Sequence, residues 1–383
     1  MILPNGLKRI KCKYSNKQQY NSYNYIGDYM KKILLFLLCL NISIPYVQAS
    51  TSSAYEYVLM DMDSGRVLAS KNKDSPRLIA SITKIMTSLV ALENANVDDI
   101  VKVDDSISKS YGSGIYISIG EEIKLIDLLY GLMLRSGNDA AIMIATYVGG
   151  SEEEFVKLMN KKAKEIGMKN TIFYNSSGLD TDTVGNKSTA YDMALLTSYA
   201  MKNATYREIV KTKKYIAKTN LKTYVWHNKN KLLSYDYITG GKTGYTERAK
   251  RTLVSTASKD NMNLVVVTLN DSDDWNTHKN LYTDAFNTYR SLKIINKNNF
   301  QVLKDKYYDK LYIKNDVYLT LKKGESKSLI SHVKLTKKQD YKDGDKVGEN
   351  YIYLGNKLIH TESIYAKRIT KKKHKLIKWF NYD

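Results

Sequence analysis

Extended segments lie on both sides of a long helical block in this sequence, and that order restricts the fold more than any other feature. Residues 54–61 and 66–70 flank a turn at 63–65 and predict a first hairpin. Apolar residues at helical spacing then predict helices over 81–95, 122–134, 139–147, 152–166 and 189–202. Strands are expected over 238–244, 252–258 and 264–269, and a helix over 274–292. This order predicts an α/β domain in which helices flank a mainly antiparallel sheet.

A second, smaller domain is predicted from about residue 296. Short alternating runs such as Val317-x-Leu319-x-Leu321 are separated by Lys-Gly and Asp-Gly turns, which is typical of an all-β domain. We therefore expect the α/β domain over 50–293, a small β-rich domain over 294–364 and a basic amphipathic tail over 365–383. The tail contains Trp379 and Phe380 among its lysines and predicts contact with a membrane surface. A solvated basic tail that binds wall polymers, or nothing, is the alternative.

The N-terminal segment resembles an export signal. Lys31 and Lys32 precede an apolar stretch, and a small-residue cleavage site ends at Ala49, so residues 31–49 predict a signal peptide. Met30 is the expected start of translation, because residues 1–29 are too polar for the front of a signal. We exclude residues 1–49 from the fold and expect a protein that acts outside the cytoplasm.

Charge and cysteine content restrict the partners and the chemistry. The chain carries a net charge of +21, and both of its cysteines, Cys12 and Cys39, lie in the excluded segment. An exported protein without cysteine has no thiol nucleophile, disulfide or thiolate-bound metal. Outside the cytoplasm we expect no nucleic acid partner, and anionic wall polymers or the lipid surface suit this charge better.

Three short motifs occur in order: Ser-Ile-Thr-Lys at 81–84, Ser-Gly-Asn at 136–138 and Lys-Thr-Gly at 242–244. Each is weak evidence alone. Each also has a purely structural explanation. The first motif could be surface residues on an amphipathic helix, the second an ordinary helix N-cap and the third a hairpin turn. The ordered trio, however, contains a hydroxyl nucleophile, an amine base, a hydroxyl-amide pair and a cationic strand. Such a set predicts an acyl-transferring serine enzyme.

Ser81 and Lys84 are three residues apart and therefore share one face of a helix. A lysine amine can take the serine proton only when it is neutral. Lowering its pKa from about 10.4 to near 7–8 costs roughly 4 kcal/mol, which burial beside a second cation such as Lys242 would supply. The helix N-terminus favours negative charge at Ser81 and directs a backbone N–H toward an oxyanion.

The sequence around these motifs resembles the serine D-alanyl-D-alanine carboxypeptidases, which are the low-molecular-mass penicillin-binding proteins. Residues 127–141, 167–180 and 240–246 are similar to family blocks, and the resemblance covers roughly 54–292. The segments 344–348 and 362–366 look like the family's C-terminal domain, less specifically. The resemblance implies a penicillin-binding or β-lactamase-like fold, peptidoglycan stem peptides as substrates, β-lactams as inhibitors, and no metal or other cofactor.

The resemblance also implies a role for each motif residue. Ser81 would be acylated by the penultimate D-Ala, with Lys84 as base and Ser136 as proton relay. Asn138 would hold the substrate amide, and Lys242 and Thr243 would bind the terminal carboxylate. Gly244 would let the substrate backbone approach the strand, and the N–H groups of Ser81 and Tyr245 would form the oxyanion hole.

Two departures from the family pattern stand beside the motifs: Ile79-Ala80 replaces Pro-Ala before the nucleophile, and Ala249-Lys250 replaces Ala-Gly after the third motif. Neither removes a reacting group.

Three alternative functions fit the sequence less well. A β-lactamase-like hydrolase needs a glutamate that activates the deacylating water, and 175–180 contains none. A non-catalytic wall-binding scaffold has no use for a complete set of reacting groups. A zinc peptidase needs metal ligands at regular spacing, and the five histidines of this sequence are scattered, at positions 227, 278, 332, 360 and 374. We expect these histidines at the surface.

Overall fold

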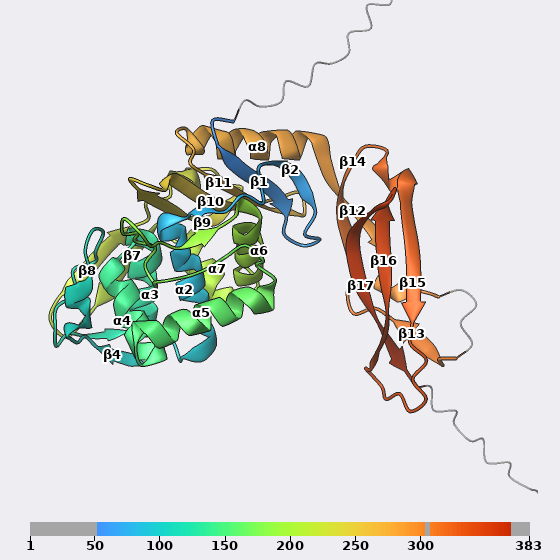
Figure 1. The fold of residues 1–383 in the computed structure, drawn as a ribbon. Coiled ribbons are helices and arrows are strands. Elements are labelled where there is room, and N and C mark those ends of the chain that lie inside the picture. The colour runs from blue at the N-terminus through green and yellow to red at the C-terminus, as the bar shows by residue number, and fades with distance from the viewer. Residues whose placement is uncertain (1–51, 303–306, 369–383) are drawn as a thin grey trace, which may run out of the picture. The chain divides into compact units, whose positions relative to one another are not determined.

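A five-stranded antiparallel sheet is the centre of the first domain in the computed structural model, which describes residues 52–302 and 307–368 (Figure 1). The strand order is β2-β1-β11-β10-β9. These strands span β1 (Glu56–Asp61), β2 (Val67–Lys71), β9 (Ile238–Thr246), β10 (Lys250–Lys259) and β11 (Met262–Leu269). Strands from both ends of the domain therefore meet, since β1 pairs with β11. β9 lies at one edge of the sheet.

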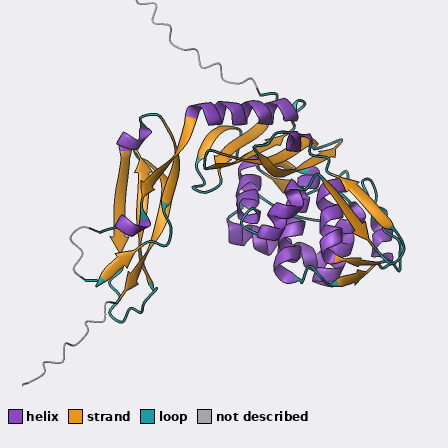
Figure 2. Cartoon of the chain, turned by 180° about the vertical axis from the view of Figure 1, so that it is seen from behind, coloured by secondary structure: helices purple, strands orange, loops and turns teal. Residues whose placement is uncertain are grey.

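Helices cover both faces of this sheet (Figures 1 and 2). α8 (Asp274–Thr288) packs on the face that presents Leu59, and the helical block packs on the face that presents Val58. This division follows from the period-2 alternation of strand side chains. The block contains α2 (Lys84–Asn94), α3 (Leu125–Tyr130), α4 (Asn138–Gly149), α5 (Glu152–Ile166), α6 (Ala190–Ala200) and α7 (Ala204–Lys211).

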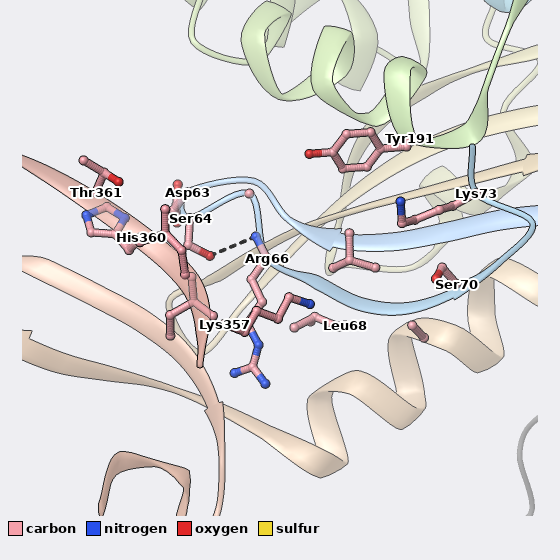
Figure 3. Close-up of a pocket in the computed structure, with 15 residues that line it drawn as sticks. Asp63, Ser64, Arg66, Leu68, Ser70, Lys73, Tyr191, Lys357, His360 and Thr361 are labelled. Atoms are coloured by element: carbon pink, nitrogen blue, oxygen red, sulfur yellow. Dashed lines mark hydrogen bonds between the residues drawn. The ribbon is translucent and has the colours of Figure 1, made fainter. Parts of the chain in front are cut away.

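Short strand pairs connect the helices. They are β3 (Arg77–Leu78) with β6 (Lys187–Ser188), β4 (Ile100–Lys102) with β5 (Glu122–Lys124), and β7 (Lys214–Lys218) with β8 (Thr223–His227). Beside the β1–β2 turn, where the Arg66 N–H donates to Ser64 Oγ (3.2 Å), lies a hollow of about 840 Å³ (Figure 3). None of the predicted site residues lines it, so cavity size does not locate the chemistry of this protein.

The second domain is built from strands around its own apolar core, which includes Leu319, Leu321, Ile352 and Ile364. β12 (Tyr289–Ile295) pairs with β14 (Val317–Lys322). A four-stranded sheet has the order β13-β17-β16-β15, with bounds Lys310–Tyr312, Lys357–Lys367, Lys346–Leu354 and Leu329–Leu335. Among the described residues, no helix of either domain combines the length and apolarity needed to cross a membrane.

The predicted fold class is confirmed, and some predicted element limits are wrong. The predicted helix over 274–292 ends at Thr288, because Tyr289 begins the strand β12 that pairs with β14. The predicted helix over 122–134 begins later, since its first three residues form β5, and it ends in a π-helical turn (Gly131–Arg135). Tyr365–Lys367 belong to β17 instead of the predicted tail. The signal peptide and residues 369–383 lie outside the described residues, and the domain limits stay predictions.

His278, which was expected at the surface, is completely buried on α8. Tyr282 Oη donates to the Ser255 carbonyl (2.7 Å), so the Ser255 hydroxyl donates to Tyr282 Oη (2.9 Å). The Ser255 oxygen must then accept from His278 Nδ1–H (2.6 Å), and His278 Nε2 accepts from Thr268 Oγ1 (3.1 Å). This chain of donors needs the neutral imidazole. Burial lowers the pKa of His278 to about 3.

This network predicts acid sensitivity. Between pH 6.5 and 3 the unfolded chain binds a proton at His278 that the folded protein does not. The free energy of unfolding therefore decreases by about 1.4 kcal/mol from this group for each unit by which the pH is lowered. His278→Gln removes the titration, and its free energy of unfolding should depend less steeply on pH in this window. Urea unfolding of both proteins at pH 4, 5, 6 and 7 measures the two slopes. Parallel slopes would show that His278 does not titrate as described.

Gly178 brings two distant segments into contact beside the first motif. Its φ is +86°, and a Cβ there would lie 2.0 Å from the Ala80 carbonyl oxygen. Ala80 itself has φ +48°, so the chain bends sharply just before Ser81. Only glycine allows the 174–180 loop to lie this close to the segment that carries Ser81.

Gly178→Ala should therefore destabilise the protein by more than about 2 kcal/mol, through both the positive φ and the clash. Gly65→Ala is a matched control, because Gly65 has φ +72° and nothing within 4 Å of its Cβ position. It should show only the conformational cost of about 1 kcal/mol. Thermal unfolding of the two variants separates these terms, and equal losses would contradict the close approach.

Candidate active site

The structure brings the three motifs together at the edge of the sheet. Ser81 lies in a 3₁₀ turn (Ala80–Thr83) that leads directly into α2, so it precedes the α-helix that was expected to begin there. Gly244 on β9 is so close that a Cβ would lie 2.9 Å from the Ser81 backbone nitrogen. The Lys-Thr-Gly strand thus passes directly beside Ser81.

Lys84 is the centre of the polar contacts. It is fully buried, and its Nζ contacts Asn138 Oδ1 (2.7 Å), the Ser177 carbonyl (2.5 Å) and Ser81 Oγ (3.1 Å). A neutral amine has two hydrogens and one lone pair. The two oxygens that can only accept take both hydrogens, which leaves the lone pair for the Ser81 hydroxyl. This is the arrangement of a base that is ready to accept the serine proton.

Burial supports the neutral amine. Burial, together with the charge of Lys229, lowers the pKa of Lys84 to about 7, against the opposing effect of the Asp139 carboxylate. Lys242 is also buried, and burial together with the charges of Lys84 and Lys229 holds its pKa well below the usual value. Its Nζ donates to the Thr243 carbonyl (2.7 Å). An anion that reached these amines would favour their protonated forms.

The loop that supplies the Ser177 carbonyl is held against α2 by polar contacts. Thr87 Oγ1 donates to the Ser176 carbonyl (2.6 Å). Asn186 Nδ2 donates to Thr83 Oγ1 (3.0 Å) and to the Asn175 carbonyl (3.0 Å). Because the same loop contacts Lys84, its position determines where the base points.

Ser136 is held in a strained backbone conformation. It has φ 65° and ψ 37°, and it ends the π-helical turn just before α4. The N-cap of α4 is Gly137, with no side-chain cap, so the explanation of Ser136 as an ordinary N-cap is wrong. Strain of this kind costs about 1–3 kcal/mol and concentrates at functional sites. Ser136 is nearly buried, beside the Asn138 amide that contacts Lys84.

The remaining predicted residues lie along the edge strand. Thr243, Gly244 and Tyr245 follow Lys242 on β9. Tyr245 is 55% exposed and its hydroxyl donates to Glu247 (2.7 Å), so its side chain points away from the buried amines. Its predicted contribution is a backbone N–H, which needs no particular side chain.

Three contributors were missed by the sequence analysis as site residues. The Ser177 carbonyl is a backbone group that any residue type supplies. Asp139 follows the second motif, is nearly buried and accepts backbone N–H groups of a neighbouring loop. Lys229 lies close enough to perturb both site lysines and contacts Ser113 Oγ (3.3 Å). Only Asp139, a charged residue next to a motif, left a signal that could have been used.

Comparisons with known proteins show which family this chain resembles. Residues 45–273 match the D-alanyl-D-alanine carboxypeptidase family, and residues 289–372 match the C-terminal domain of penicillin-binding protein 5. The carboxypeptidase DacC of Escherichia coli is 32% identical over 82% of this chain and 83% of its own. DacF of Bacillus subtilis is 39% identical, over 55% of each chain, so this chain spans about half the length of that relative.

Solved structures of similar proteins have a similar fold. Penicillin binding protein 5 from Haemophilus influenzae superposes with a TM-score of 0.70 at 26% identity, over 84% of this chain and 98% of its own. DacD from Francisella tularensis has a TM-score of 0.64 at 25% identity, over 82% and 93%. The family match covers more than half of the chain, and the DacC match covers most of both proteins. This chain belongs to the D-alanyl-D-alanine carboxypeptidase family.

Proposed function

We propose that the protein is a serine D,D-carboxypeptidase that removes the terminal D-Ala from peptidoglycan pentapeptide stems and is acylated by penicillins. One observation carries the proposal: Nζ of the buried Lys84 lies within hydrogen-bond distance of Asn138 Oδ1, the Ser177 carbonyl and Ser81 Oγ, so that the lone pair of a neutral amine would face the serine. A structural lysine would not be held so that its lone pair meets a serine at the edge of a sheet. Family membership supports the same chemistry.

In the acylation step, Ser81 Oγ attacks the carbonyl carbon of the penultimate D-Ala while Lys84 takes the hydroxyl proton. The oxyanion would lie against the N–H groups of Ser81, near the start of its 3₁₀ turn, and Tyr245 on the edge strand. The proton would pass through Ser136 to the leaving amine, which departs as D-Ala. Water then attacks the ester carbonyl, the bond between that carbon and Ser81 Oγ breaks, Oγ takes back a proton from the water, and the stem leaves one residue shorter.

Substrate binding would use the other motif residues. Lys242 and Thr243 would hold the terminal carboxylate, and this anion would restore the charge of Lys242. Asn138 Nδ2 donates one hydrogen to the Tyr111 carbonyl (2.6 Å), and its second hydrogen would bind a substrate carbonyl. Gly244 lets the peptide lie against β9, whose outer edge is unpaired in the sheet.

The setting is proposed from the sequence. A signal peptide over 31–49 would export the chain, which would act at the cell wall or the outer face of the cytoplasmic membrane. The basic segment 365–383 would contact the membrane surface. Deletion of the residues after Arg368 tests this contact by sedimentation with anionic vesicles.

The first test is acylation by benzylpenicillin. Intact mass of the 50–383 protein should show one penicillin bound for minutes or longer, and Ser81→Ala should show none. Persistence is expected because residues 175–180 contain no glutamate that could activate a deacylating water. A short-lived adduct with penicillin consumed would indicate a β-lactamase, and no adduct a non-catalytic scaffold.

The pH dependence of acylation tests the base. Neutral Lys84 increases as the pH rises through its pKa of about 7, so the acylation rate should rise about tenfold per unit below pH 7 and level off above about pH 8. Stopped-flow acylation between pH 5.5 and 9 gives this profile. Lys84→Arg, which cannot lose its proton in this range, should lose at least about 10²-fold in rate. A rate that still rises about tenfold between pH 8 and 9 would contradict a base of this pKa.

A further inference from the structure

The loop over residues 111–116 lies along the N-terminus of α4, beside the second motif. Its Tyr111 carbonyl accepts from Asn138 Nδ2 (2.6 Å), and its Ser113 carbonyl accepts from the Asn138 backbone N–H (2.7 Å). A Cβ on Gly112 would lie 3.3 Å from Asn138 Nδ2. The loop therefore touches the side chain that is proposed to hold the substrate amide.

Two buried carboxylates support this loop. Asp139 accepts the N–H groups of Ile115 (3.0 Å) and Tyr116 (2.6 Å). Glu121, which is completely buried, accepts the Tyr224 hydroxyl (2.9 Å). Lys222 Nζ and Tyr224 Oη of the β7–β8 hairpin lie 2.7 and 3.3 Å from the Tyr116 carbonyl, so the hairpin packs against the loop. Burying charged groups is costly unless their hydrogen bonds are satisfied, so the conformation of this loop is strongly specified.

Two aromatic rings of this loop are exposed to solvent. Tyr116 is 75% exposed and Tyr111 is 59% exposed. Tyr116 has φ +62°, which is a rare conformation for a bulky residue. Its backbone is held on both sides, by Asp139 on the N–H and by Lys222 Nζ on the carbonyl (2.7 Å). An exposed ring in a strained and over-determined backbone is typical of a ligand contact.

The proposed direction of the bound substrate shows which part of it lies near the loop. The terminal carboxylate is proposed at Lys242, the attacked carbonyl at Ser81, and the preceding amide at Asn138. The substrate therefore continues past Asn138 toward its earlier residues and the amino sugar that carries the stem. Tyr111 is in contact with Asn138 through its carbonyl, so the loop lies on this upstream side.

We infer that Tyr111 and Tyr116 form an aromatic rim that binds the glycan-linked part of a muropeptide. Aromatic faces pack well on the apolar faces of sugar rings and on alkyl chains, and rigid tyrosines lose little entropy on binding. The rim makes the enzyme prefer stems that are still attached to their sugars. This inference rests on the proposed carboxypeptidase function.

The experiment compares D-Ala release from two substrates: a disaccharide pentapeptide and diacetyl-L-Lys-D-Ala-D-Ala. Variants are Tyr111→Ala, Tyr116→Asn and the double substitution. Asparagine tolerates the positive φ, so Tyr116→Asn removes the ring and keeps the backbone. Tyr147→Ala is the control, since Tyr147 is an exposed tyrosine on α4 that contacts Asp99. Melting temperatures verify that each variant is folded.

The ratio of kcat/KM for the disaccharide pentapeptide over the tripeptide should fall about five- to tenfold in the double variant, which is the usual contribution of such aromatic contacts. Tyr147→Ala should leave the ratio unchanged. An unchanged ratio in the double variant, or equal losses on both substrates, would overturn the rim. Failure of the wild-type protein to release D-Ala from either substrate would overturn the proposed function itself.

Discussion

The contact between the Lys84 amine and the Ser81 hydroxyl is the interaction on which the rest of this structure depends. Moving the pKa of a lysine from 10.5 to about 7 costs roughly 5 kcal/mol of folding stability at neutral pH, comparable to the whole stability of many domains. The fold meets that cost with a large core on both faces of one sheet. Two carbonyl acceptors then orient the amine so that burial produces a base and not merely a destabilising charge.

Three parts of the chain must meet for this contact to form. α2 carries Lys84, the N-terminus of α4 carries Asn138, and the 174–180 loop carries the Ser177 carbonyl. Strained residues mark two of these junctions, since both Ala80 and Ser136 have positive φ. Gly178 lies against Ala80 at the first of these junctions, where no side chain fits. The active site is thus the place where local conformational preference is overruled by long-range packing.

Much of this was predictable from the sequence. The period of the apolar residues identified the five strands of the central sheet, α8 and most of the helical block, but not α7 or the β7–β8 hairpin. The ordered motifs identified side chains that the structure brings together, among them Ser81, Lys84 and Asn138. Helix limits failed where β-type and helical patterns overlap, as at Tyr289, because pairing with β14 decides between them. The burial of His278 was missed because partners on β10 and β11 make a polar residue acceptable in a core. The contact of the Ser177 carbonyl with Lys84 could not be predicted, since every residue has a backbone carbonyl.

The most direct test of the account is the pKa of Lys84 itself. Proteins labelled with ¹³C at the lysine ε-carbons can be titrated by NMR, and the Lys84 resonance is assigned by its absence in Lys84→Arg. We expect this resonance to titrate near pH 7, well apart from those of exposed lysines. A Lys84 resonance that titrates near 10.5 would contradict the neutral base and, with it, the explanation of how Ser81 is activated.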